Sequence, residues 1–224
     1  MSAVPRSEVE TTDRGARARE RLLAEATRLF AEKGYAGTST RLICLAAQAN
    51  VAAIHYHFDG KEGLYREVLL APIRELLARF EGYDDPTLPL PDALRLVLGA
   101  FLHPLAGPGE DPRAAQMQRL HLREMVEPST DYAEAVSLQV RPHHEALTQL
   151  LARHIGLAEP DRDVQQLSFA IVAMAQDCSM SREFMRQLAP DLLRGPGAAE
   201  RLLDRLVDWG CALVAHERQR RQVK

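Results

Sequence analysis

Residues 37–64, GTSTRLICLAAQANVAAIHYHFDGKEGL, contain the pattern that decides the fold of the N-terminal part of this chain. Two short apolar-periodic segments, residues 41–47 and 51–58, are separated by only three residues. A run of hydroxyl residues precedes the first segment and Asn50 precedes the second, and both residue types cap helix N-termini. Two helices joined by so short a turn indicate a helix-turn-helix, in which the second helix enters the major groove of DNA.

The second of these helices is apolar on one side only, so it is not expected to be buried on all sides. Val51, Ile54 and Phe58 can face inward. The positions left to point outward are small or polar: Ala52, Ala53, His55 and Tyr56. Alanine methyl groups can contact thymine methyl groups in the major groove, and tyrosine and histidine can donate to phosphate oxygens. Lys61 begins the next helix, where the N-terminal dipole favours a second contact with an anion.

Helical periodicity continues on both sides of this motif. The expected helices span residues 17–33, 61–80, 92–105, 113–126, 129–155, 161–188 and 198–221. We expect a break at Pro142 and a kink at Pro72, because proline lacks the N–H that a helix interior needs. No stretch alternates apolar and polar residues long enough to suggest a sheet, so the sequence predicts an all-α fold.

The composition places limits on function and setting. The formal net charge of the 224 residues is −3, which by itself argues against a nucleic-acid binder. The charge is uneven, however, since residues 14–66 sum to +4 and residues 67–224 to −5. Three widely spaced cysteines argue against structural zinc and disulfides. The first 13 residues are polar and lack the apolar core of a signal peptide, so we expect a disordered extension on a cytoplasmic protein.

Two longer motifs carry a family resemblance. Residues 19–40 read R-x-x-L-L-x-x-A-x-x-L-F-A-E-K-G-Y-x-G-T-S-T, and residues 43–64 read I-x-x-A-A-x-x-N-x-x-x-I-x-Y-H-F-x-x-K-E-x-L. This combination, which covers nearly all of residues 17–66, resembles the TetR family of bacterial transcriptional regulators. The resemblance implies a three-helix DNA-binding domain at residues 14–66 and a larger helical domain for ligand binding and dimerisation at residues 67–224.

The resemblance also implies the DNA contacts. Thr40 would touch phosphate and Arg41 a base, while His57 and Lys61 would reach phosphates. The recognition helix would present Asn50, Ala52, Ala53, His55 and Tyr56. Two alternatives stay open: Thr40 can be only a helix cap, and His57 can be a structural histidine. The chain departs from the family pattern at three places, where Gln48-Ala49 replaces Gly-Val, His55 replaces a tyrosine, and Cys44-Leu45 replaces Ala-Glu.

The C-terminal part resembles the CecR/CerR-like branch through L-R-E-M-V-E-P-S at residues 122–129 and V-R-P-H at residues 140–143. The candidate effector contacts are polar residues among apolar ones: His103, Gln118, His121, Arg123, His143 and Asp177. Each of them has a structural or surface role as its alternative. Two apolar stripes predict a dimer seam, namely Leu167, Ile171, Met174 and Cys178, and Leu202, Leu206, Trp209 and Leu213. The alternative is that both stripes face the core of the monomer.

These observations predict a homodimeric repressor that binds a palindromic DNA operator and is released by a small-molecule effector. A transcriptional activator or dual regulator of the same fold is the alternative within the family. An all-α enzyme is a second class, but the chain has none of the motifs that mark a nucleophile, a phosphate loop or a zinc protease. An architectural DNA binder without a ligand is a third, which the 158 residues after position 66 disfavour. We expect no catalytic residues, no cofactor and no metal.

Overall fold

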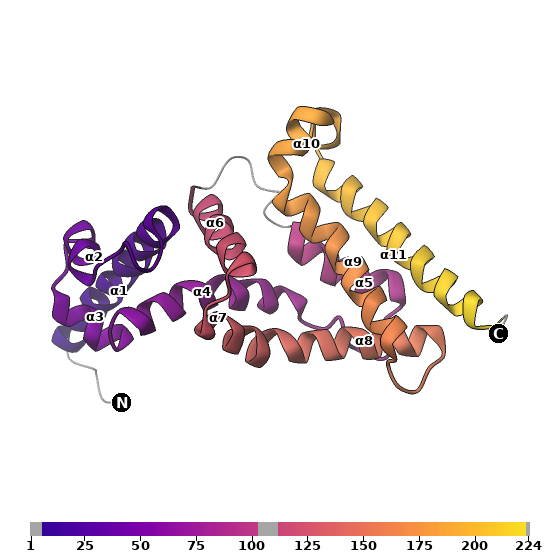
Figure 1. Cartoon of the computed structure of the whole chain (residues 1–224), viewed down its shortest axis with the longest axis horizontal. Helices are drawn as coiled ribbons and strands as arrows, with labels where there is room; N and C mark the ends of the chain where they lie inside the picture. Colours follow the sequence, from indigo (N-terminus) through magenta and orange to yellow (C-terminus); the bar gives the residue numbers. More distant parts are fainter. Residues whose placement is uncertain (1–5, 103–111, 223–224) are drawn as a thin grey trace. The chain divides into compact units, whose positions relative to one another are not determined.

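A computed structural model describes residues 6–102 and 112–222 of the chain. Every regular element in these residues is helical, which confirms the all-α prediction (Figure 1). The elements are α1 (Arg6–Lys33), α2 (Thr40–Ala47), α3 (Val51–Phe58), α4 (Lys61–Leu77), η1 (Ala78–Phe80), α5 (Leu90–Leu102), α6 (Pro112–Val126), α7 (Thr130–Ala135), η3 (Val136–Val140), α8 (Arg141–Ile155), α9 (Arg162–Met180), α10 (Arg182–Leu188), η4 (Pro190–Leu192) and α11 (Ala198–Gln222). No helix of the described residues is long and apolar enough to cross a bilayer.

The helices form two compact units, and the chain passes between them more than once. One unit comprises Met1–Pro72 and Glu110–Ala135, and the other comprises Ile73–Gly109 and Val136–Lys224. The predicted domains divide the chain only at residue 66. The structure instead groups α6 and α7, which lie far along the sequence, with the helix-turn-helix. The reason is tertiary: α6 packs against α1, a pairing that no local pattern announces.

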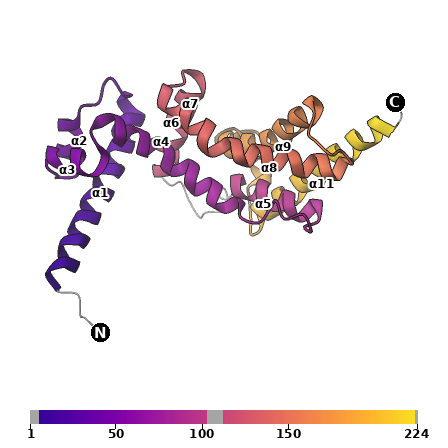
Figure 2. The ribbon, with the colours of Figure 1, turned by 90° about the horizontal axis from the view of Figure 1, so that it is seen from below.

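The first unit is built on the apolar stripe of α1. Leu22, Ala26 and Phe30 are fully buried, and α2 and α3 contribute Ile43 and Ile54 to the same core. The predicted disordered extension, residues 1–13, is corrected for the part the structure describes, because α1 already begins at Arg6. Arg6, Glu8, Glu10 and Arg14 are good helix formers among these early residues. These first turns project beyond α2 and α3 (Figure 2).

The turn between α2 and α3 forms without glycine. Gln48 adopts the left-handed conformation (φ 50°, ψ 47°), which only a few per cent of non-glycine residues adopt. Ser39 caps α2 by accepting from the Leu42 N–H at 3.2 Å, and Asn50 caps α3 by accepting from the Ala52 N–H at 3.1 Å. The expected hydroxyl cap of α2 is therefore Ser39, and Thr40 is the first residue of the helix.

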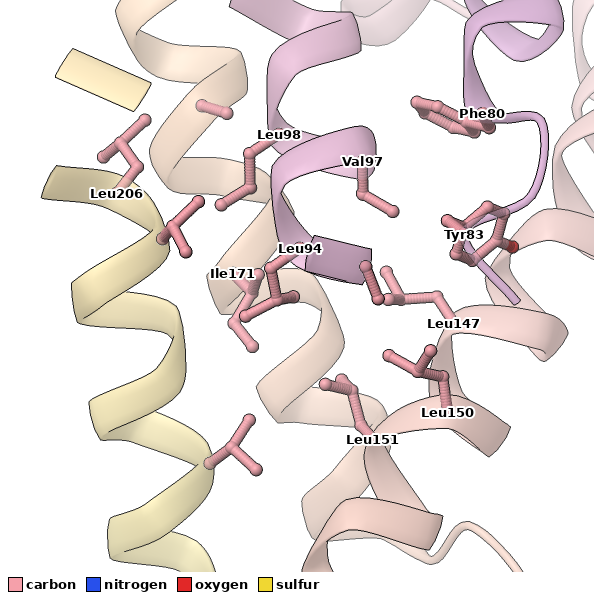
Figure 3. Packing of buried hydrophobic residues seen from close by; sticks show 14 of the residues in the cluster. Phe80, Tyr83, Leu94, Val97, Leu98, Leu147, Leu150, Leu151, Ile171 and Leu206 are labelled. Carbon is pink, nitrogen blue, oxygen red and sulfur yellow. The ribbon is translucent and has the colours of Figure 1, made fainter. Parts of the chain in front are cut away.

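The core of the second unit is organised around α5. Figure 3 shows Leu94 and Leu98 of α5 among side chains from α8, α9 and α11, including Leu151, Ile171 and Leu206. At Gly210 of α11, a Cβ atom would lie 2.9 Å from the side-chain atom Cδ1 of Leu94. The absence of a side chain at this position lets α11 lie against α5.

Two predicted helix boundaries need correction. The expected helix 92–105 begins two residues earlier, as α5, and its last three residues lie outside the described residues. The break expected at Pro142 lies earlier, in the π-helical turn Val136–Val140, and Pro142 occupies the first turn of α8, where its missing N–H costs little. The expected helix 161–188 is interrupted at Ser181, which ends α9 and precedes α10. The helix α4 continues through Pro72 to Leu77.

Charged residues join the end of α11 to the start of α9. Asp161 caps α9 by accepting from the Val164 N–H at 3.1 Å and pairs with Arg221 at 2.7 Å. Arg220 reaches both Asp163 and Glu217 at 2.5 and 2.9 Å. The hydrogen bonds from Arg221 and from the Val164 N–H lower the pKa of Asp161 to about 2.

A charge-removing variant tests this network. Asp161→Asn keeps an acceptor for the helix cap but loses the pairing charge, so it should cost about 0.5–1 kcal/mol at pH 7, as exposed pairs do. The folded-state pKa is lowered, so the ionised Asp161 stabilises the fold above about pH 4 and this contribution is lost as the pH falls toward about 2. Thermal unfolding should therefore show a difference between parent and variant at pH 7 that shrinks as the pH approaches 2.

The matched control is Asp191→Asn, because Asp191 makes an exposed pair only with the nearby Arg194 at 3.3 Å. It should unfold like the parent at both pH values. An Asp161→Asn deficit that is unchanged at low pH would contradict the assignment.

Candidate nucleic-acid interface

The helix α3 presents a narrow outward face. Ile54 and Phe58 are buried, as expected, whereas Tyr56 is 85% exposed. The other exposed residues of this face are Asn50, Ala52 and His55, and Ala53 is partly exposed. Val51 was expected to face inward and is instead exposed, because it lies in the first turn beyond the reach of the core. The rotation of α3 therefore directs one row of small and polar side chains to the solvent.

The C-terminal end of α3 places two aromatic side chains together. The rings of Tyr56 and His57 meet edge to face with centroids 4.9 Å apart. His57 is half-buried and its ring also lies 6.0 Å from that of Phe58. Asp59 then ends the helix in the left-handed conformation (φ 57°), with its N–H donating to the His55 carbonyl oxygen at 3.1 Å. Both roles considered for His57, packing and phosphate contact, fit this half-buried position.

Lys61 is held at the start of α4 by an aromatic cluster, which consists of Phe30, Tyr35 and Tyr65. Its Nζ atom lies 4.0 Å from the centroid of the Tyr35 ring, within the range of a cation–π interaction. The Tyr35 ring lies 4.9 Å from that of Tyr65, which meets Phe30 edge to face at 4.8 Å. The lysine at the positive end of α4 therefore has a defined position.

Several cations of the N-terminal part are engaged within the unit. Arg19 pairs with Glu67 at 2.8 Å and lies 5.3 Å from the centroid of the Phe58 ring. Arg21 donates to the Ala47 carbonyl oxygen at 3.2 Å, which satisfies the end of α2. Arg41 is exposed, and the described residues include no ion-pair partner for it. The net charge of +4 for residues 14–66 therefore overstates how much positive charge is available to a ligand.

Thr40 and Arg41 lie together at the start of α2. Thr40 is partly exposed and Arg41 is exposed. Together with the outward face of α3 and with Lys61, all nine residues predicted for DNA lie in the first unit, on or beside α2, α3 and the start of α4.

The sequence did not identify three further residues near this site. Tyr35 supports Lys61, and its only signal was its place in the K-G-Y motif. Leu45 of α2 is exposed, although a leucine suggested the core. Glu124 is buried in the same unit and bonds to Tyr65 at 2.5 Å, a contact across 59 residues that no local pattern indicates.

The structure disperses the predicted effector residues. His103 lies outside the described residues. Gln118, His121 and Arg123 belong to α6 in the first unit, whereas His143 and Asp177 belong to the second. Two grooves on the second unit, one between α5, α8 and α11 and one beside Asp161 and Arg221, are lined by other residues.

Four of these residues have structural contacts. His121 Nδ1 lies 2.9 Å from the Tyr132 hydroxyl, and burial lowers the pKa of His121, which favours a neutral ring. Arg123 lies over Gly34, where a Cβ atom would come within 2.5 Å of the guanidinium. The His143 ring packs 5.6 Å from that of Phe80. Asp177 accepts from the Ser181 hydroxyl at 2.9 Å.

The groove between α5, α8 and α11 has a volume of about 480 Å³. Its lining residues are Leu90, His154, Cys211, Val214, Ala215, Arg218, Gln219 and Gln222. Within residues 6–102 and 112–222, no three metal-ligating side chains come together.

The predicted dimer stripes divide between the core and the surface. Ile171 and Leu206 are fully buried in the monomer, which corrects their assignment to a dimer seam. Leu167, Met174, Cys178 and Leu202 are partly buried and also pack against that core. Trp209 and Leu213 of the second stripe are exposed, at 50% and 37%, and α9 exposes Phe169, which was not part of either stripe, at 67%. The outward apolar face therefore includes two predicted residues of α11, whereas on α9 it differs from the predicted stripe.

Comparison with protein families gives two matches. Residues 22–68 match the family described as "Bacterial regulatory proteins, tetR family". Residues 90–211 match the family described as "HTH-type transcriptional dual regulator CecR, C-terminal domain". The second match covers more than half of the 224 residues.

Individual relatives agree with these matches. The chain is 41% identical over 67 residues to the probable HTH-type transcriptional regulator YttP of Bacillus subtilis, a segment that covers 30% of this chain and 28% of that protein. It is 37% identical over 49 residues to IcaR of Staphylococcus epidermidis, named as the negative transcriptional regulator of the biofilm operon icaADBC, which covers 22% of this chain and 26% of that protein. The chain thus matches about a quarter of the length of these curated relatives.

Solved structures extend the likeness to the whole fold. A regulator of the tetR family from Rhodococcus RHA1 has a TM-score of 0.62 at 22% identity, over 88% of this chain and 96% of that one. The TetR-family regulator SCO4454 from Streptomyces coelicolor has a TM-score of 0.60 at 21% identity, over 90% of this chain and 96% of that one. At this level of identity the likeness concerns the fold alone.

A glycine between α3 and α4 provides a test of the interface geometry. A Cβ atom on Gly63 would lie 1.7 Å from the Phe58 carbonyl oxygen, so α4 can begin close to the end of α3 only without a side chain there. Gly63→Ala should lower stability by about 3 kcal/mol through this clash, measured by chemical unfolding. It should also displace Lys61.

Gly15→Ala is the matched control, because a Cβ atom on Gly15 of α1 would meet nothing within 4 Å. It should raise stability by about 0.5–1 kcal/mol through helix propensity. Equal stabilisation by both substitutions would contradict the close approach of α3 and α4.

Proposed function

The chain belongs to the TetR family of transcriptional regulators, and from that premise we propose that it is a homodimeric repressor. It binds a palindromic operator through two copies of α3 and is released by a small-molecule effector. The observation that carries the DNA-binding step is the outward face of α3, where Tyr56 stands exposed on a helix whose opposite side is buried. Such a helix can enter a major groove without exposing its core.

The DNA contacts divide into base and phosphate contacts. Ala52, Ala53 and His55 face the base edges, with Asn50 at the N-terminus of the same helix. Tyr56 and Lys61 reach phosphates on one flank, while Thr40 at the start of α2 reaches them on the other and the neighbouring Arg41 contacts a base. Phosphate contacts fix the register of the protein, and base contacts provide sequence specificity.

A dimer is supported by the exposed apolar side chains of the second unit. Phe169 of α9, Phe184 and Leu188 of α10, and Trp209 and Leu213 of α11 are all exposed in the monomer. Large exposed apolar residues that gather on neighbouring helices are typical of interaction surfaces. A palindromic operator requires the same two-fold symmetry that such a dimer has.

The effector would bind in the C-terminal part, of which residues 90–211 match the CecR C-terminal domain. His103, Gln118, His121, Arg123, His143 and Asp177 remain the candidate contacts. The ligand can displace the repressor only by its difference in affinity between the DNA-bound and free forms. The acidic net charge of residues 67–224 keeps that part off DNA and is consistent with a cytoplasmic regulator.

A dual regulator is the second candidate, and the description of the CecR family favours it. The two candidates differ in the sign of their effect. A reporter gene placed under the operator should be silenced by the protein if it represses. It should be activated at some operators if the protein is a dual regulator.

Removing the predicted phosphate contacts tests the interface. The operator is first selected from genomic fragments, and affinity is then measured by fluorescence anisotropy at fixed salt. Tyr56→Ala and Lys61→Ala should each weaken binding about tenfold, because each subunit of the dimer loses one contact. If each subunit neutralises about three phosphates, log affinity should fall against log salt with a slope of roughly −5, and Lys61→Ala should reduce that slope by about 2.

Lys33→Ala is the control for Lys61→Ala, since Lys33 is an exposed lysine at the end of α1. It should leave the salt slope unchanged. Unaltered operator affinity in both Tyr56→Ala and Lys61→Ala would overturn the assignment of α3 and α4.

A charge placed in the exposed apolar face tests the dimer. Trp209→Glu should weaken dimerisation by about 30-fold or more, because tryptophans at interface centres typically contribute at least 2 kcal/mol. Sedimentation velocity over a range of concentrations measures this change. Leu45→Glu, at an exposed leucine on α2 in the other unit, should remain dimeric. A parent protein that is monomeric at every concentration would refute the proposal.

A further inference from the structure

The segment of residues 122–129, LREMVEPS, is the part of the CecR-like resemblance that the proposed function does not use. It ends α6 and continues to Ser129, and it lies in the same compact unit as the helix-turn-helix. The structure shows its contacts with α1 and α4 in that unit.

Glu124 is the centre of these contacts. Its side chain is only 3% exposed, although it carries a carboxylate. Its Oε1 atom accepts from the Tyr65 hydroxyl at 2.5 Å. Its Oε2 atom accepts from both the Ser129 N–H at 2.8 Å and the Ser129 hydroxyl at 2.7 Å. Three donors thus compensate the desolvation of one buried carboxylate, as a buried charge requires.

Tyr65 connects this carboxylate to the aromatic cluster. Its ring contacts both Phe30 and Tyr35, and the Tyr35 ring lies under Lys61 Nζ. Burial, together with the bond to Glu124, raises the pKa of Tyr65, so its hydroxyl stays a proton donor. A continuous series of contacts therefore runs from Glu124 through Tyr65 and Tyr35 to Lys61.

A second contact holds the same segment against α1. The Arg123 guanidinium lies over Gly34, which has φ 73° and would clash with it through any Cβ atom. Gly34 immediately follows α1 and precedes Tyr35. Two adjacent residues of the segment therefore contact the aromatic cluster or its neighbour. Arg123 lies over Gly34, which precedes Tyr35, and Glu124 bonds to Tyr65.

We propose that Glu124 is a positioning residue of the DNA interface, through which the segment of residues 122–129 sets the position of Lys61. This inference rests on the proposed function and adds a positioning residue to it. Loss of the bonds at Glu124 would release Tyr65 and remove the support of Tyr35 under Lys61, although Glu124 itself does not touch DNA.

The test uses the full-length protein and the selected operator. Glu124→Gln replaces two acceptor oxygens by one acceptor oxygen and an NH2 donor, so either the Tyr65 hydroxyl or Ser129 loses its acceptor. Tyr65→Phe removes only the hydroxyl and keeps the ring in the cluster. Each variant should weaken operator binding by about three- to thirtyfold, the range typical of residues along a coupling network.

Glu127→Gln is the matched control, since Glu127 is exposed one turn after Glu124 and loses the same charge. Removing a negative charge alone should leave DNA binding unchanged or slightly stronger. Weaker operator binding by Glu124→Gln could therefore not be explained by the loss of a negative charge, because that loss alone would strengthen binding or leave it unchanged.

A double-mutant cycle with Lys61→Ala separates positioning from general destabilisation. If Glu124 and Tyr65 act through Lys61, their substitution should change operator affinity by less than about twofold when Lys61 is already alanine. An undiminished loss in that background would overturn the inference, and so would operator binding unchanged by both substitutions. Should Glu124→Gln unfold below the assay temperature, Tyr65→Phe carries the test.

These outcomes differ from a failure of the proposed function. If Lys61→Ala weakens operator binding while Glu124→Gln and Tyr65→Phe do not, only the positioning role is wrong. If the parent protein selects no operator, the repressor proposal and this inference both fall.

Discussion

Burial of Ile54 and Phe58 fixes the rotation of α3 about its axis, and the rest of the DNA-binding unit depends on that rotation. The two side chains are four residues apart, on one face of a helix of only eight residues. Their burial stabilises the unit by roughly 3–6 kcal/mol, which no alternative rotation could recover. The same burial leaves Tyr56 exposed between them, since an adjacent position on a helix points elsewhere. A packing constraint therefore generates the functional face.

The start of α4 follows from a similar constraint. Gly63 lets α4 begin against the Phe58 carbonyl oxygen, so that Lys61 lies close to the end of α3. The Tyr35 ring of the aromatic cluster contacts Lys61 Nζ, and Glu124 of α6 bonds to Tyr65 of the same cluster. Short-range packing places the DNA-facing residues, while a long-range contact supports them.

Much of this organisation could be predicted from local pattern. The apolar stripe of α1, the cap at Asn50 and the inward positions of Ile54 and Phe58 follow from helical spacing, and the structure confirms them, whereas Val51 is exposed. The dimer stripes were less well predicted, because an amphipathic helix between a core and an interface has two apolar faces. Ile171 and Leu206 fill the core, whereas Phe169 and Trp209 remain exposed, and spacing alone does not distinguish the two faces. The break at the π-helical turn before Pro142 likewise depends on neighbours rather than on the proline.

The sequence by itself determined the helical fold class, the position of the helix-turn-helix and the outward face of α3. These features depend on residues within about ten positions of one another, where periodicity and capping act. Only the tertiary structure decided that α6 belongs with the DNA-binding unit and that Glu124 bonds to Tyr65, 59 residues away. A buried carboxylate needs hydrogen-bond donors, and the folded chain can supply them from residues far away in the sequence. Such a pairing cannot be predicted from the local sequence pattern.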